Sequence, residues 1–215
     1  MNRVSPSGRP TLRIVLTGID GSGKSTAARD LTRTIEARGG SAILLRNPAG
    51  RRTMAAWWAA LGRTPGPRVQ DALETVTRVV NVLVNEVRLR DFDGVVVLDR
   101  GLECQLALRE ARGLPRGVIV PWLQRVLPAA DVVAHFELPV DVALERIRRR
   151  ATDDESPAGL ASLAAGYRRL PAYGSFTLVD ASADRESVMR FLLGLVPDGA
   201  AGDAPPGRAP AATAR

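Results

Sequence analysis

The segment Gly18-Ile19-Asp20-Gly21-Ser22-Gly23-Lys24-Ser25-Thr26 follows the spacing G-x-x-x-x-G-K-[ST] of a phosphate-binding loop. Its glycines let the main chain wrap closely around a phosphate, with successive N–H groups turned inward. Lys24 supplies a compact cation for the β and γ phosphates, and the Ser25 hydroxyl is placed to ligate Mg²⁺. The pattern therefore predicts that residues 18–26 bind ATP with Mg²⁺.

The flanking sequence meets the structural requirement of such a loop. Leu12–Thr17 is an apolar run rich in β-branched residues and predicts a buried strand. Lys24–Arg38 predicts a helix that stops at Gly39-Gly40. The start of this helix adds free N–H donors and the positive end of its dipole, both of which favour a bound phosphate.

Basic residues are abundant, but Lys24 is the only lysine in a chain of 215 residues with a net charge of +7. No second lysine is left to build the N-K-x-D guanine-reading motif of most GTPases. The arginines are spread along predicted helices instead of forming an aromatic-interleaved stripe, so we expect no nucleic-acid partner. No apolar run reaches 18 residues, so we expect no membrane partner. The single cysteine excludes a disulfide framework and fits a cytoplasmic protein.

Predicted strands alternate with predicted helices along the whole chain, which is typical of an α/β fold with a mainly parallel sheet covered on both faces. We expect 1–10 to be a flexible leader, 11–196 to be one domain with a short basic lid near 146–158, and 197–215 to be a disordered tail. The expected strands are Leu12–Thr17, Ala42–Leu45, Val95–Leu98, Asp131–Leu138 and Ser175–Val179, and the expected helices are Lys24–Arg38, Met54–Leu61, Val69–Arg90, Leu102–Ala111, Val118–Val126, Val140–Arg150, Ala158–Leu170 and Ser182–Leu195.

At three places beyond the loop the sequence resembles the thymidylate kinase family of P-loop nucleoside monophosphate kinases. Leu44–Pro48 is similar to the family's loop after the second strand, Asp99-Arg100 resembles its D-R-[YFHW] motif, and Leu138–Arg150 resembles its strand, lid helix and basic lid. The resemblance runs from about Leu12 to Val196. It implies a P-loop NTPase fold with five strands and phosphoryl transfer from ATP to a nucleoside monophosphate.

The resemblance also implies roles for individual residues. Lys24, Asp99 and the lid residues Arg149 and Arg150 would be catalytic, with Ser25 and Asp99 near the metal. Arg146 and Arg148 would join the loop in binding ATP. The acceptor would be bound by Asp20, Arg46, Asn47, Arg51, Arg52, Glu74, Arg78, Arg100 and Glu103.

The acceptor half departs from the family pattern. Gly101 stands where the family has an aromatic residue after D-R, and Glu74 stands where the family stacks a Phe on thymine. A stacked base is worth about 1–3 kcal/mol, so the change argues for an altered acceptor. Three alternatives stay open: dTMP or a related nucleoside monophosphate, a hydroxyl of a nucleoside-like or other metabolite, and a nucleotide-binding regulatory protein with reduced turnover.

Two further expectations concern packing. Leu73, Val76, Val80, Leu83, Val84 and Val87 recur at helical spacing within Val69–Arg90. The family is usually dimeric through such helices, but the same stripe would serve equally as the core of a monomer. His135 and Cys104 are expected to be packed structural side chains.

Overall fold

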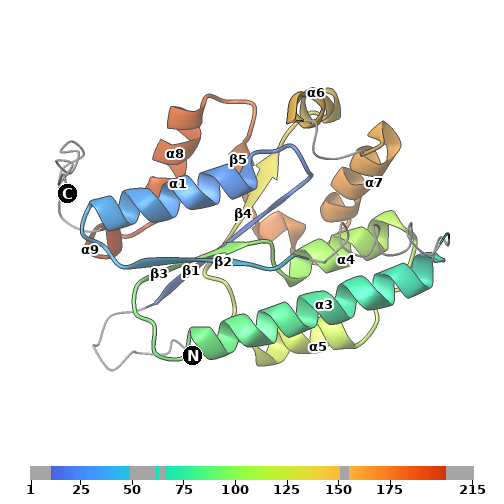
Figure 1. Cartoon of the computed structure of the whole chain (residues 1–215), viewed down its shortest axis with the longest axis horizontal. Helices are drawn as coiled ribbons and strands as arrows, with labels where there is room; N and C mark the ends of the chain where they lie inside the picture. The colour runs from blue at the N-terminus through green and yellow to red at the C-terminus, as the bar shows by residue number, and fades with distance from the viewer. Residues whose placement is uncertain (1–10, 49–61, 63–65, 151–154, 202–215) are drawn as a thin grey trace.

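The fold was analysed in a computed structural model of the whole chain, and the structure describes residues 11–48, 62, 66–150 and 155–201. A parallel five-stranded sheet with the order β2-β3-β1-β4-β5 runs through the molecule (Figure 1). The strands are β1 (Leu12–Gly18), β2 (Ala42–Arg46), β3 (Val95–Asp99), β4 (Val132–Glu137) and β5 (Thr177–Asp180). This confirms the predicted fold class.

The three central strands are buried because helices cover both faces of the sheet. β1 pairs with β3 on one side and with β4 on the other, in parallel register. Val95, Val96 and Val97 are all fully buried, as expected for a continuous apolar run in a parallel sheet. The carboxyl ends of β1, β2 and β3 therefore meet at one edge, where ligands of open α/β sheets bind.

Helices form a layer on each side of the sheet (Figure 1). α1 and α8 pack together on one face, while α4 contacts α3, α5 and α7 on the other side. The helices are α1 (Lys24–Ala37), α3 (Pro67–Arg88), α4 (Leu102–Ala111), α5 (Ile119–Val126), α6 (Val140–Arg150), α7 (Pro157–Arg168), α8 (Arg185–Gly194) and α9 (Asp198–Ala201), with a 3-10 turn η1 (Pro171–Ser175) before β5.

The long helix α3 buries polar side chains and exposes apolar ones. Its buried residues are Asp71, Glu74, Thr75, Arg78, Val82 and Asn85. Its exposed apolar residues are Val69, Leu73, Val76, Val80, Leu83, Val84 and Val87, which are between 38% and 64% exposed. The apolar stripe predicted from the sequence therefore does not form the core of this chain.

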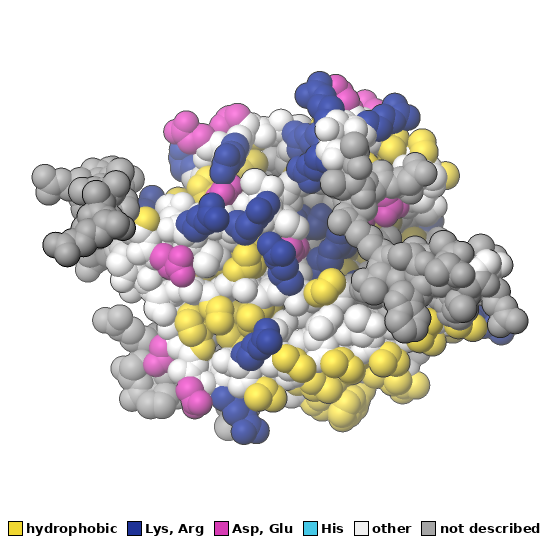
Figure 2. Space-filling model, viewed as in Figure 1, with side chains coloured by type: hydrophobic (Ala, Val, Ile, Leu, Met, Phe, Trp, Pro, Cys, Tyr) yellow, Lys and Arg dark blue, Asp and Glu magenta, His cyan; other side chains and the backbone are white. Residues whose placement is uncertain are grey.

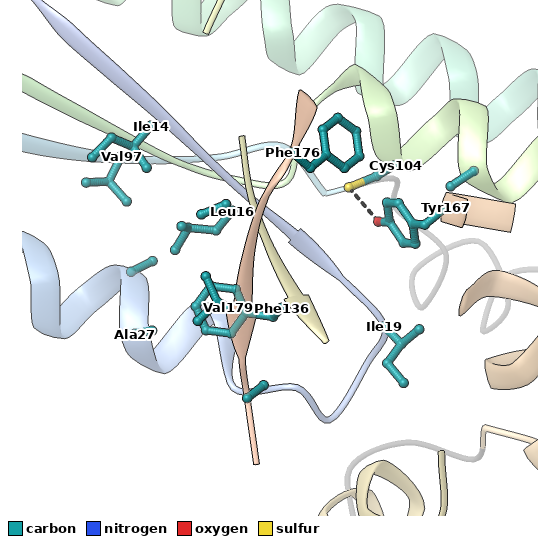
Figure 3. Close-up of a cluster of buried hydrophobic side chains, with 14 of the residues drawn as sticks. Ile14, Leu16, Ile19, Ala27, Val97, Cys104, Phe136, Tyr167, Phe176 and Val179 are labelled. Carbon is teal, nitrogen blue, oxygen red and sulfur yellow. Dashed lines mark hydrogen bonds between the residues drawn. The ribbon is translucent and has the colours of Figure 1, made fainter. Parts of the chain in front are cut away.

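The apolar core contains the two side chains that we expected to be structural. The Tyr167 hydroxyl donates a hydrogen bond to the buried sulfur of Cys104 at 3.0 Å (Figure 3). His135 is buried in β4, hydrogen-bonded through Nδ1 to Thr17 Oγ1 at 3.0 Å. Burial lowers the pKa of His135 to about 4, although the nearby Glu137 carboxylate acts in the opposite direction. The prediction that His135 and Cys104 are packed structural side chains is confirmed.

Some predicted boundaries differ from the observed ones. A short helix, α9, lies at the start of the tail that we expected to be disordered. The last long helix begins at Arg185 and not at Ser182, because the Asp184 carboxylate caps it by accepting a hydrogen bond from the Ser187 N–H. The predicted helix Met54–Leu61 lies outside the described residues. No helix in the described ranges is long and apolar enough to cross a membrane.

Candidate active site

The phosphate loop joins β1 to α1 at the carboxyl edge of the sheet. Gly21 and Gly23 have φ values of 84° and 87°, in the left-handed region that favours glycine. A Cβ on Gly21 would lie only 2.6 Å from the carbonyl oxygen of Ala143, so α6 packs directly against the loop. Ser25 is exposed at the start of α1. The loop thus makes a turn that requires glycine at these two positions.

Lys24 is held inside the loop. Its Nζ donates hydrogen bonds to the Ile19 carbonyl at 2.5 Å and to the Ser22 hydroxyl at 3.0 Å. Burial, followed by the positive charge of Arg100, lowers the pKa of Lys24 to about 8. The ammonium is therefore poorly solvated in the free protein, and a phosphate in the loop would supply the negative charge that it lacks.

Arg100 reaches the loop from the neighbouring strand. Its guanidinium forms an ion pair with Asp20, and its main-chain φ of 77° is an unusual value for a residue other than glycine. The Arg100 N–H donates to the Leu16 carbonyl of β1 at 3.1 Å, which fixes this conformation. Burial alone would lower the pKa of Arg100, but the Asp20 carboxylate outweighs it and raises that pKa above its ordinary value.

Asp99 ends β3 beside these groups. Its side chain is buried, and Oδ1 has no hydrogen-bond partner within the described part of the chain. The described residues contain no cluster of three or more His, Cys, Asp or Glu side chains that could hold a metal. The Asp99 carboxylate and the Ser25 hydroxyl fit Mg²⁺, which is usually held by one or two protein oxygens together with substrate phosphates and water. Ser25 and Asp99 are the residues that would hold it.

Asn47, at the end of β2, ties two loops together. Its side-chain Nδ2 donates to the Arg100 carbonyl at 2.8 Å, and its Oδ1 accepts from Asn85 at 2.8 Å. Arg78 donates through Nη1 to the Asn47 carbonyl at 2.9 Å. Asn47 therefore positions Arg100 and Arg78 through its own hydrogen bonds.

A buried polar network joins α3 to α4 next to Arg78. Arg78 Nε donates to Gln105 Oε1 at 3.2 Å, and Gln105 Nε2 donates to Asp71 Oδ1 at 2.9 Å. Arg109 forms an ion pair with Asp71 at 2.9 Å. Sequence reasoning missed Asp71, Gln105, Arg109 and Arg112. The sequence signal for them was polar residues separated by three or four positions, which lie on one face of a helix. This spacing joins Asp71, Glu74 and Arg78 on the first helix, and Gln105, Arg109 and Arg112 on the second.

Glu74 is part of this network. Its carboxylate accepts two hydrogen bonds from Arg112, at 2.8 and 2.9 Å, and one from Gln70 at 3.1 Å. The Glu74 side chain is completely buried. The position predicted to contact the acceptor base is therefore occupied by an ion pair between α3 and the end of α4.

Glu103 points away from this network. Its Oε1 accepts a hydrogen bond from Gln124 of α5 at 3.1 Å. Glu103 and Gln124 line an open pocket of about 220 Å³ together with side chains of α3, α5 and the sheet, and Gly101 and Val15 belong to the same lining. Glu103 is thus separated from Glu74, although both were predicted to bind the acceptor.

The remaining predicted residues are exposed, bonded to other groups, or outside the described ranges. Arg46 is exposed at the end of β2. Arg146 donates to the Ala181 carbonyl at 2.9 Å, just after β5. Arg149 pairs with Glu145 on the same helix, and Arg148 and Arg150 are exposed at the end of α6. Arg51 and Arg52 lie outside the described residues, as does 151–154 of the expected lid.

The strand order, the loop between β1 and α1, and Asp99-Arg100 at the end of β3 define a P-loop NTPase fold. Residues 16–192 match the family described as thymidylate kinase. The chain belongs to the thymidylate kinase family.

Curated relatives agree with this assignment. The thymidylate kinase of Xanthomonas oryzae pv. oryzae (strain PXO99A) is 32% identical over 209 residues, which cover 91% of this chain and 88% of the relative. The thymidylate kinase of Akkermansia muciniphila is 32% identical over 180 residues, which cover 81% and 86% of the two chains. Family membership implies a nucleotide kinase.

Proposed function

We propose that the protein transfers the γ-phosphoryl group of ATP to a nucleoside monophosphate, giving ADP and a nucleoside diphosphate. One observation carries this proposal: the Lys24 ammonium of the loop and the Asp20–Arg100 pair lie together at the carboxyl edge of β1 and β3. The loop is suited to the donor phosphates, and the Arg100 fork is suited to the phosphate of an acceptor. Two anionic substrates need cations on both sides of the transferred group.

The chemistry asks the protein mainly for position and charge. The Lys24 ammonium would neutralise charge on the transferring phosphoryl group, where its low solvation makes it more effective than in water. Arg100, held by Asp20 and by the Asn47 side chain, would keep the acceptor oxygen in line with the γ-phosphate. Mg²⁺, bound by Ser25 and Asp99, would supply further charge neutralisation on the phosphates.

The arginines of α6 would complete the donor side. α6 packs against the loop at Gly21, so its basic end lies on an element in direct contact with the phosphate site. Arg148, Arg149 and Arg150 are exposed there, and Arg149 would exchange its partner Glu145 for a bound phosphate. We assign Arg149 and Arg150 to the transition state, and Arg146 and Arg148 to ATP binding.

We further propose that the protein is a homodimer through α3. The exposed residues Val69, Leu73, Val76, Val80, Leu83 and Val87 are spaced by four and three residues in turn, the heptad pattern of paired helices. Such a stripe matches a second copy of itself across a twofold axis. Hydrophobic side chains gather along the lower edge of the molecule, where α3 and α5 lie (Figures 1 and 2). Ile119 and Trp122 of α5 are also exposed.

An ADP-release assay over all ribo- and deoxyribonucleoside monophosphates, with the parent nucleosides as hydroxyl acceptors, tests the reaction. We expect ADP release with at least one monophosphate and loss of that release in the Lys24→Met variant. Release with nucleosides alone would favour a hydroxyl kinase. ATP binding without release for any acceptor would favour a regulatory protein, and either result would overturn the proposal.

A further inference from the structure

The contact between α3 and α4, here called the α3–α4 seam, is made by Glu74 and Arg78 with Gln105 and Arg112. It adjoins the proposed acceptor phosphate site at Arg100. Arg78 donates through Nη1 to the carbonyls of Asn47 at 2.9 Å and Gly101 at 3.4 Å, so its guanidinium adjoins the loops that follow β2 and β3. Gly101 directly follows Arg100. An acceptor whose phosphate sits at Arg100 would therefore have Arg78 and the seam as near neighbours.

Side chains of the two helices close this seam. Glu74 of α3 and Arg112 at the end of α4 form a two-point ion pair, with Nη1–Oε2 and Nη2–Oε1 distances of 2.8 and 2.9 Å. Beside it, Gln105 bridges Arg78 and Asp71, and Arg109 bonds both Asp71 and Thr75. Glu74 and Gln105 are each 0% exposed, so no gap is left between the helices at this level.

A planar base could enter only by displacing these contacts. Separating a buried, two-point ion pair leaves two charges without compensation, and this costs more than stacking of one base returns. Within the described residues, the network that fills the seam consists of charged and amide side chains and offers no aromatic face to a base.

We propose that the Glu74–Arg112 pair determines acceptor specificity by closing the α3–α4 seam to a stacked base, so that dTMP is a poor acceptor for this chain. The favoured acceptor is a monophosphate whose non-phosphate part is polar and binds outside the seam. The inference rests on the proposed kinase function and adds the residues that select the acceptor. Glu74 and Arg112 act here as specificity determinants, separate from the residues that neutralise the transferred phosphoryl group.

The test compares acceptor preference in wild type and in the double variant Glu74→Ala/Arg112→Ala, which removes both charges and leaves no unpaired buried ion. The quantity measured is the ratio of kcat/KM for dTMP to kcat/KM for the best other monophosphate. We expect this ratio to be below one in wild type and to rise about ten-fold or more in the double variant, the scale on which small changes in a pocket alter selectivity.

A matched control comes from the same helix. Arg13 and Glu86 form an equivalent two-point pair, at 2.7 and 3.0 Å, three turns farther along α3. The variant Arg13→Ala/Glu86→Ala should lower the unfolding temperature and leave the acceptor ratio unchanged. Should the first double variant fail to fold, Glu74→Gln keeps the shape, removes the charge, and should shift the ratio in the same direction.

Three results would overturn the inference. The first is a wild-type protein that prefers dTMP over every other monophosphate. The second is a variant in which turnover of all acceptors falls equally, since that marks a purely structural ion pair. The third is absence of turnover with every monophosphate, which removes the proposed kinase function as well and is distinguished from the other two by the lack of any ADP release.

Discussion

The guanidinium of Arg100 pairs with the carboxylate of Asp20, and this contact joins the phosphate loop to the end of β3 across 80 residues of sequence. The pair orients both partners: Arg100 occupies a φ of 77°, and Asp20 is held within the loop. Both side chains are mostly shielded from water, so the contact is stronger than an exposed ion pair. It sets the spacing between the loop that would hold ATP and the strand end that would hold the acceptor.

Replacing Asp20 by Asn should therefore impair catalysis more than folding. The amide keeps the size of the side chain but leaves the Arg100 guanidinium without its charged partner. We expect kcat/KM for the acceptor to fall about 100-fold, or about 2.7 kcal/mol, with a smaller change in the KM for ATP. Steady-state kinetics with each substrate varied in turn would measure this.

Arg100→Lys provides the companion measurement. Lysine keeps the charge but lacks the planar fork that bonds carboxylate and phosphate together. Its loss in kcat/KM should be of similar size. If either variant retained wild-type kinetics, the pair would be a stabilising contact only.

Lys24→Met should separate stability from activity. The Lys24 pKa is lowered to about 8 by burial and then by Arg100, so at neutral pH the protonated side chain is destabilised in the fold by about 3 kcal/mol. Methionine removes this penalty together with two hydrogen bonds. We expect the unfolding temperature of the ligand-free variant to match or exceed that of wild type, and turnover to fall by about 100-fold or more.

The pH dependence of stability is an independent check on the lowered pKa of Lys24. Because the folded pKa lies below the unfolded value of 10.5, the penalty is present below pH 8 and is relieved as pH rises from about 8 to 10.5. Wild type should gain stability relative to Lys24→Met across this window in chemical unfolding. A constant difference between the two proteins would contradict the assigned pKa.

Charge placed on the exposed stripe of α3 should separate the subunits. Val80 lies near the middle of the stripe and is 52% exposed. A glutamate there would be solvated in a monomer but buried without a partner in a dimer. We expect Val80→Glu to halve the mass in light scattering. Phe191→Glu on α8, where Phe191 is 44% exposed, is the control and should leave the mass unchanged. Equal masses for all three proteins would argue against a dimer through α3.

Much of the fold follows from local patterns in the sequence. Val95–Val97 is a run of apolar residues that only a strand buried on both faces explains, and the glycines of the phosphate loop determine its turn. Such features depend on neighbours within a few residues. Asp99 and Arg100 were predictable for the same reason, since they directly follow a strand whose end lies at the ligand-binding edge.

The acceptor region was less predictable because its contacts join distant segments. Glu74 and Arg112 are 38 residues apart, and nothing local to either residue indicates the other. The stripe on α3 posed a related problem: periodicity separates an apolar face from a polar face, but it does not tell which face the domain buries. Here the buried face is polar, because Asp71, Glu74 and Arg78 find charged or amide partners on α4 and at its C-terminal end.

His135 should make the protein sensitive to acid. Burial lowers its pKa from 6.5 to about 4, so the unfolded chain binds a proton more readily than the folded one as pH falls. The stabilisation from this residue is fully present above pH 6.5 and is lost progressively between pH 6.5 and 4, to a total of about 3 kcal/mol. We expect His135→Asn, which does not titrate in this range, to be less stable than wild type at pH 7.5 but to lose less stability on acidification. Urea unfolding of both proteins at several pH values from 7.5 to 4.5 measures the two slopes, and parallel slopes would show that His135 is not the group responsible.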